Sequence, residues 1–156
     1  IVMIKDSSVH FDWHVYYSLC YILNDSYRPQ LRFGRIQGVE RCIVGYSGGA
    51  ELNPTYRFIR DHTEAVLVEF NPHVVSYEDL LIEWSRMHTP SYAKKTQYKS
   101  AIWYLDEEQK RTAEDFIKGL KASAGGNPVY TDLGPVTRFY RAEEYHQNFM
   151  NKQGRY

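Results

Sequence analysis

Apolar and polar positions group along the chain into short blocks that predict strands. The run VYYSLCYIL at residues 15–23 is dense in aromatic and branched side chains without helical spacing, which indicates a buried strand. Residues 39–46, 64–70 and 100–105 are predicted to be three further strands, and residues 128–133 an edge strand.

Between the first two strands, residues 25–38 carry helix signals. Asp25 or Ser26 is a candidate N-cap, Pro29 falls in the first turn, and Gly38 ends the segment. The pattern predicts a helix of about three turns.

Two more helices are predicted from caps and apolar spacing. One opens at Ser76, with Asp79 three residues on, and its apolar stripe is Tyr77, Leu80, Leu81 and Trp84. The other opens at Asp106 and ends at Gly125–Gly126, and its buried face is Ala113, Phe116, Ile117 and Leu120. Core packing is the favoured interpretation of these aromatic residues.

The order strand, helix, strand, strand, helix, strand is typical of a split βαβ arrangement. We therefore predict an α+β sandwich with a largely antiparallel sheet. A length of 156 residues with 43% hydrophobic and 24% charged residues fits one domain over residues 1–156.

Charge composition disfavours two classes of partner. Lys+Arg and Asp+Glu are balanced at 19 each, so no global positive field attracts phosphate backbones or anionic lipid. No apolar run of about 18 residues and no leader-like opening stretch occurs. We expect a soluble monomer that binds neither nucleic acid nor membrane, with the cytoplasm slightly favoured.

Cysteine and histidine positions predict no metal site. Cys20 and Cys42 could form one bridge, but two small buried hydrophobes in a reduced protein is the favoured interpretation. His62, His88 and His146 are far apart, and no cysteine or carboxylate completes a zinc pattern. No metal or other cofactor is expected.

Six blocks occur in a characteristic order: FGRIQGVERCIVGYSGG, NPTY, DHTEAVLVEFNPHVVSYEDLL, MHTP, TQYKSAIWY and AEEYHQNF. With them the chain resembles the peptide-methionine (S)-S-oxide reductases, the MsrA family, from about residue 19 to 150. The gaps resemble a short-loop branch of that family. The resemblance implies a two-layer sandwich with a ferredoxin-like split βαβ core.

One junction departs from the family pattern. The family carries Gly-Cys-Phe-Trp there, whereas counting back from Phe33-Gly34 gives residues 24–27, Asn-Asp-Ser-Tyr, with Asp25 in the cysteine position. The family's reaction resembles thiolate attack on a sulfoxide sulfur, and a carboxylate has no comparable reduced state. Cys20 would point to the opposite face of its predicted strand, and Cys42 lies in another strand. We therefore predict that methionine sulfoxide reduction is lost.

The polar half of the family site is retained. By the resemblance, Glu64 matches the acid that protonates the sulfoxide oxygen, and Tyr56 and Tyr98 match two pocket hydroxyls. Ser26, Tyr27 and His62 are further candidates for contact with a small-molecule ligand.

Two functions stay open on this interpretation. In one, Asp25 and Glu64 share acid and base roles in a re-purposed, non-redox enzyme acting on a small, cationic amine or imine. In the alternative, the pocket belongs to a non-catalytic ligand-binding pseudoenzyme. Asp25 acting as a helix cap would favour the second.

Overall fold

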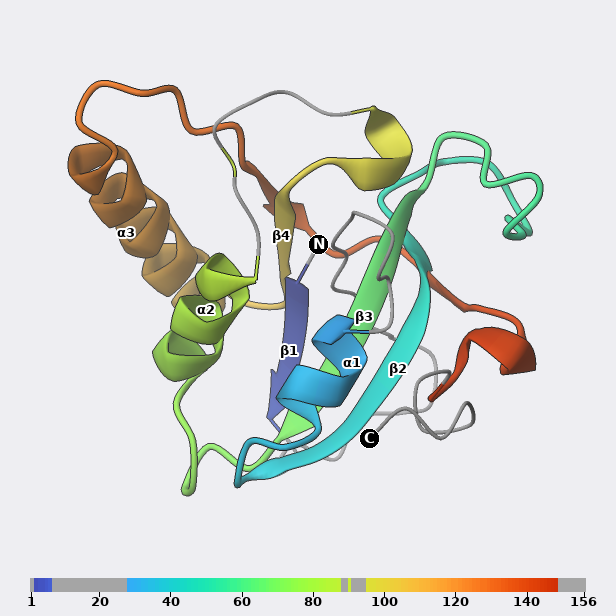
Figure 1. The fold of residues 1–156 in the computed structure, drawn as a ribbon, viewed down its shortest axis with the longest axis horizontal. Helices are drawn as coiled ribbons and strands as arrows, with labels where there is room; N and C mark the ends of the chain where they lie inside the picture. Colours follow the sequence, from blue (N-terminus) through green and yellow to red (C-terminus); the bar gives the residue numbers. More distant parts are fainter. Residues whose placement is uncertain (1, 7–27, 88–89, 91–94, 149–156) are drawn as a thin grey trace.

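The computed structural model describes residues 2–6, 28–87, 90 and 95–148 (Figure 1). Its elements, in chain order, are β1 (Val2–Asp6), α1 (Arg28–Phe33), β2 (Val39–Ser47), β3 (Thr63–Phe70), α2 (Tyr77–Arg86), η1 (Thr96–Tyr98), β4 (Ala101–Tyr104), α3 (Glu107–Ser123), β5 (Asp132–Pro135), β6 (Phe139–Arg141) and η2 (Glu144–His146).

The strands form one mixed sheet in the order β5-β4-β1-β3-β2-β6. β2 pairs antiparallel with β3 on one side and with β6 on the other. β1 runs parallel to both of its neighbours, β3 and β4, and β4 is parallel to β5. The β2–β3 pair sets Tyr46 opposite Glu64, and the β2–β6 pair sets Tyr46 opposite Tyr140.

The helices lie against one face of the sheet (Figure 1). The buried stripe of α2 (Leu80, Leu81 and Trp84) and two residues of α3 (Ala113 and Ile117) pack in one cluster with Val66, Val68 and Phe70 of β3. Burial of this continuous apolar surface is the main stabilising term of the fold.

The opposite face of the sheet carries a smaller cluster. Ala65 and Leu67 of β3 meet Ala101 and Trp103 of β4 there, with half-buried Phe139 packed against them. Because side chains alternate along a strand, β3 is apolar on both faces over most of its length.

Several predicted elements are present with nearly the predicted bounds. The strands at 39–46, 64–70 and 100–105 correspond to β2, β3 and β4. Ser76 caps α2 with a complete capping box to Asp79, and Asp106 caps α3 by accepting the Gln109 N–H. The helices therefore begin where short polar side chains satisfy the first free N–H groups.

Other predicted bounds differ from the structure. The helix predicted over 25–38 is shorter, because after Phe33 the chain continues in three-residue turns, such as Ile36 N–H to Phe33 C=O at 3.0 Å. The edge strand falls at β5, a few residues later than predicted, and β1 and β6 were not expected from the sequence. The strand predicted at 15–23 lies outside the described residues.

Candidate active site at the start of strand β3

Three polar residues are buried where the chain enters β3. His62 and Thr63 are 0% exposed and Glu64 is 7% exposed, although the rest of the strand is almost wholly apolar. Burying a carboxylate costs free energy unless it is hydrogen-bonded. Such a group at a strand end is a strong candidate for chemistry.

Glu64 is held by the segment before β4. The Gln97 side chain donates from Nε2 to Glu64 Oε1 at 2.7 Å, and the Thr63 hydroxyl donates to the Thr96 carbonyl at 2.8 Å. These two bonds attach η1 to the start of β3, and Tyr98 is the last residue of η1. The sequence does not single out Gln97, although the TQYKSAIWY block contains it.

Tyr46 is the cross-strand neighbour of Glu64, and its hydroxyl donates to Glu143 Oε2 at 2.7 Å. Burial, the hydrogen bond to Glu143 and the nearby charges of Glu143 and Glu64 raise the pKa of Tyr46 well above its usual range. Burial opposes ionisation of Glu143, but the bonds from the Tyr46 hydroxyl and the Tyr56 N–H outweigh it and lower the Glu143 pKa. The proton therefore stays on Tyr46 and the charge on Glu143.

Tyr56 joins this polar group through its backbone N–H, which donates to Glu143 Oε1 at 3.0 Å. It is 46% exposed and packs against the ring of His146, with the centroids 4.5 Å apart. The ring of Tyr145, which is also exposed, has its centroid 4.2 Å from the centroid of the His146 ring. Burial lowers the pKa of His146, while the Glu143 charge acts in the opposite direction.

His62 packs beneath the glycine turn that follows β2. A Cβ atom on Gly49 would lie 2.5 Å from His62 Nδ1 and 2.3 Å from Asp61 Oδ1, so glycine is needed for this close approach. Burial lowers the pKa of His62, although the negative charge of Asp61 acts in the opposite direction. The Asp61 carboxylate accepts the Ala50 N–H at 2.6 Å. A substrate contact by His62 stays a prediction.

The structure thus brings Glu64, Gln97, Tyr46 and Glu143 into one hydrogen-bonded and cross-strand group, with Tyr56 attached to it through Glu143. Asp25, Ser26 and Tyr27 lie outside the described residues, so their placement beside Glu64 is untested. Among the described residues no group of three His, Cys, Asp or Glu side chains could hold a metal ion.

Cys42 is the one cysteine among the described residues. It lies in β2 opposite Val68, and burial, helped by the charge of Glu69, raises the pKa of its thiol to about 12. At neutral pH it is a protonated thiol and a poor nucleophile.

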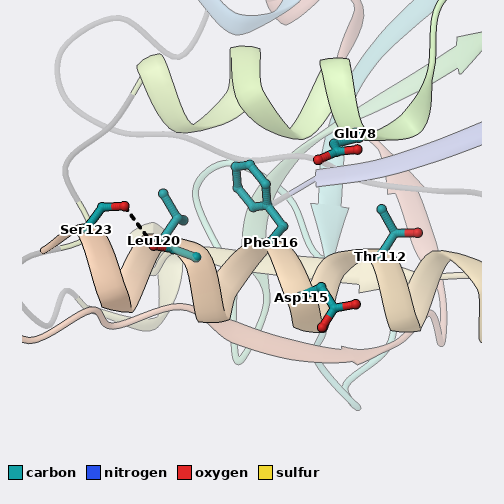
Figure 2. A pocket seen from close by; sticks show the side chains of 7 residues that line it. Glu78, Thr112, Asp115, Phe116, Leu120 and Ser123 are labelled. Carbon is teal, nitrogen blue, oxygen red and sulfur yellow. Dashed lines mark hydrogen bonds between the residues drawn. The ribbon is translucent and has the colours of Figure 1, made fainter.

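A separate groove of about 530 Å³ lies between α2 and α3 (Figure 2). It is lined by Glu78, Thr112, Asp115, Phe116, Gly119, Leu120 and Ser123. The Ser123 hydroxyl donates to the Gly119 carbonyl at 2.8 Å, and the Thr112 hydroxyl to the Glu108 carbonyl at 3.0 Å. Both hydroxyls are used within the helix, and the carboxylates that line the groove, Glu78 and Asp115, belong to exposed residues. The groove therefore has no buried acid like Glu64.

The site and fold together define an α+β protein with a buried acid at a strand start and a tyrosine, Tyr46, opposite it on the neighbouring strand. The family model described as "Peptide methionine sulfoxide reductase" matches residues 28–156. The chain belongs to this family. Among the helices that the structure describes, none is long and apolar enough to cross a membrane.

Individual relatives and one solved structure agree with the family model. The chain is 40% identical over 136 residues to a peptide methionine sulfoxide reductase of Fragaria ananassa, covering 80% of this chain and 71% of that one. It is 41% identical over 133 residues to the reductase MsrA of Methanosarcina acetivorans, covering 78% and 71%. The solved MsrA of Corynebacterium diphtheriae has a TM-score of 0.76 at 25% identity, covering 90% and 75%. The predicted α+β fold class and family are confirmed.

The prediction that the chain has lost reductase chemistry, as a non-redox enzyme or a pseudoenzyme, is wrong. Relatives that are 37–41% identical over most of the chain are named methionine sulfoxide reductases. The placement of Asp25 at the family's cysteine position stays a prediction, because the family match covers residues 28–156 only. That match carries no information on residues 1–27.

Proposed function

We propose that this protein reduces methionine sulfoxide in peptides, with Glu64 as the proton donor. The observation that carries the proposal is the buried Glu64 carboxyl, held by Gln97 at 2.7 Å at the start of β3. The reductase names of its relatives supply the reaction class. The ligand is the small methyl sulfoxide end of a methionine side chain, and the chain acts as a monomer.

The reaction needs one thiol and two reducing equivalents. A thiolate attacks the sulfoxide sulfur, a proton from Glu64 goes to the sulfoxide oxygen, and the oxygen passes to the thiol sulfur as a sulfenic acid while the thioether leaves. An external dithiol then reduces the sulfenic acid to the thiol, forming a disulfide and water.

Cys20 is the thiol we assign to this step. Cys42 is disfavoured because burial holds its pKa at about 12. The strand predicted over residues 15–23, which would turn Cys20 away from the site, lies outside the described residues. Tyr56 and Tyr98 would orient the sulfoxide oxygen toward Glu64.

Turnover of N-acetylmethionine sulfoxide with dithiothreitol tests the proposal. We expect N-acetylmethionine from the parent and from Cys42→Ser, and none from Cys20→Ser. A folded parent without turnover would refute the proposed function. Turnover that survives Cys20→Ser would refute the assignment of the thiol alone.

A further inference from the structure

We infer that Glu143 is a positioning residue of this site, because its carboxylate holds the backbone from which the Tyr56 side chain extends. The inference rests on the proposed function, in which Tyr56 contacts the sulfoxide. Glu143 itself is not assigned to the reaction and does not need to touch the substrate.

The two oxygens of Glu143 have different partners. Oε2 accepts the Tyr46 hydroxyl at 2.7 Å, and Oε1 accepts the backbone N–H of Tyr56 at 3.0 Å. Tyr46 belongs to β2, whereas Tyr56 lies in the loop between β2 and β3. One ionised side chain therefore joins the neighbour of the acid to the loop that carries the pocket tyrosine, through charge-assisted bonds.

The segment that carries Glu143 is itself fixed to β2. The Ala142 N–H donates to the Val44 carbonyl at 2.9 Å, and the buried Gln147 side chain accepts the Val44 N–H at 3.1 Å. Gln147 Nε2 also donates to the Val44 and Ala142 carbonyls. Glu143 thus projects from a rigid support, which is the requirement for a residue that positions another.

The same segment also holds the Tyr56 ring, since His146 packs against it with centroids 4.5 Å apart. Around Tyr56 the loop makes its own turn, where Thr55 and Phe58 exchange backbone hydrogen bonds of 3.2 and 3.0 Å. These bonds lie within the loop itself. The Glu143 bond to the Tyr56 N–H instead ties the loop to the segment that follows β6.

Removing the carboxylate should therefore weaken sulfoxide binding through Tyr56. We would titrate N-acetyl-L-methionine (S)-sulfoxide into the protein and follow tyrosine ring resonances by NMR. Without a reductant, each protein molecule can reduce at most one equivalent of the sulfoxide. We expect Glu143→Ala to raise Kd about tenfold, the scale of one hydrogen bond to a charged group. Glu143→Gln, which retains one acceptor oxygen, should lie between Glu143→Ala and the parent.

Glu144→Ala is the matched control. Glu144 is the next residue along the chain. It is exposed, and its carboxylate pairs with Arg141 at 2.6 Å. Its variant should bind like the parent, because exposed ion pairs contribute little.

A double variant separates positioning from general loss of structure. If Glu143 acts through the Tyr56 hydroxyl, adding Glu143→Ala to Tyr56→Phe should not raise Kd further. A full additional rise in that background, or a parent-like Kd for Glu143→Ala alone, would overturn the inference. Binding without turnover in the parent would refute the proposed function and leave the positioning role supported, whereas no binding by the parent would refute both.

Discussion

The two ends of β3 are built for different purposes. From Val66 to Phe70 the strand is apolar on the helix-covered face, where Val66, Val68 and Phe70 meet α2. At its start the chain instead buries His62, Thr63 and Glu64. The apolar end contributes stability by removing hydrocarbon surface from water, whereas each polar group at the start lowers stability unless it has a partner.

The difference shows where this fold tolerates the free-energy cost of burying polar side chains. The polar end is placed where β2, β6, η1 and the NPTY loop converge, so backbone and side-chain donors are close by. Stability lost at functional positions is commonly offset elsewhere in a protein. Four changes, from the largest expected effect to the smallest, test this division of the strand.

Glu64→Gln should lower the turnover of methionine sulfoxide by about 10²–10⁴-fold, the usual contribution of a general acid, with no loss of thermal stability. Steady-state rates and melting temperatures check both. The control is Glu69→Gln at the other end of β3, where the carboxylate pairs with Arg41 at 2.6 Å. Equal loss of turnover in the two variants would contradict the assignment of the chemistry to the start of β3.

Leu67→Ala should reduce the free energy of unfolding by about 2–5 kcal/mol, because a fully buried side chain leaves a cavity. Urea unfolding measures the loss. Turnover per folded molecule should stay at the parent value, and Val74→Ala, on an exposed side chain, should have little effect on either quantity. A selective loss of activity in Leu67→Ala would show that the apolar end also serves the site.

Ser76→Ala should cost about 0.5–2 kcal/mol, because it removes the capping box of α2, whose stripe packs on the apolar end of β3. Chemical denaturation gives the value. Ser85→Ala, where the hydroxyl donates to the Ile82 carbonyl inside the same helix, provides a control and should be nearly neutral. If both serines cost the same, the cap is not the cause.

Acidification should destabilise the polar end. Burial lowers the pKa of His62 and of His146 below the ordinary value of 6.5, so the unfolded chain takes up protons first as pH falls through that value. Stability should therefore be retained above this window and decline from pH 7.5 to 5.5. His62→Gln should weaken the decline, and His73→Gln, at an exposed position, is the control. A parent without any decline would contradict the prediction.

The sequence predicts the central strands and the two long helices well because their signals are local. Ser76 with Asp79, and Asp106 before an apolar stripe, specify helix starts within four residues. The pairing of Glu64 with Gln97, and of Glu143 with Tyr46 and Tyr56, joins residues 33 to 97 positions apart. No periodicity encodes such contacts, since they depend on how the strands and loops are placed in space.

The short strands were also difficult to predict, for a related reason. β6 has three residues and forms by pairing with the end of β2, so its existence depends on a partner distant in sequence. The resemblance and the charged position of Glu64 at the start of an apolar run identify it as a candidate. Glu143 lies among other polar residues in the AEEYHQNF block, so its charge does not stand out from its neighbours.

The half-buried thiol of Cys42, with its raised pKa, makes the protein convenient for selective chemical labelling. Thiol reagents act on the thiolate, and a pKa of about 12 leaves almost none of it at neutral pH. A maleimide or iodoacetamide reaction at pH 7 should therefore leave Cys42 unmodified in the native protein. A probe, spin label or mass tag could then be attached at a more reactive thiol without first mutating Cys42.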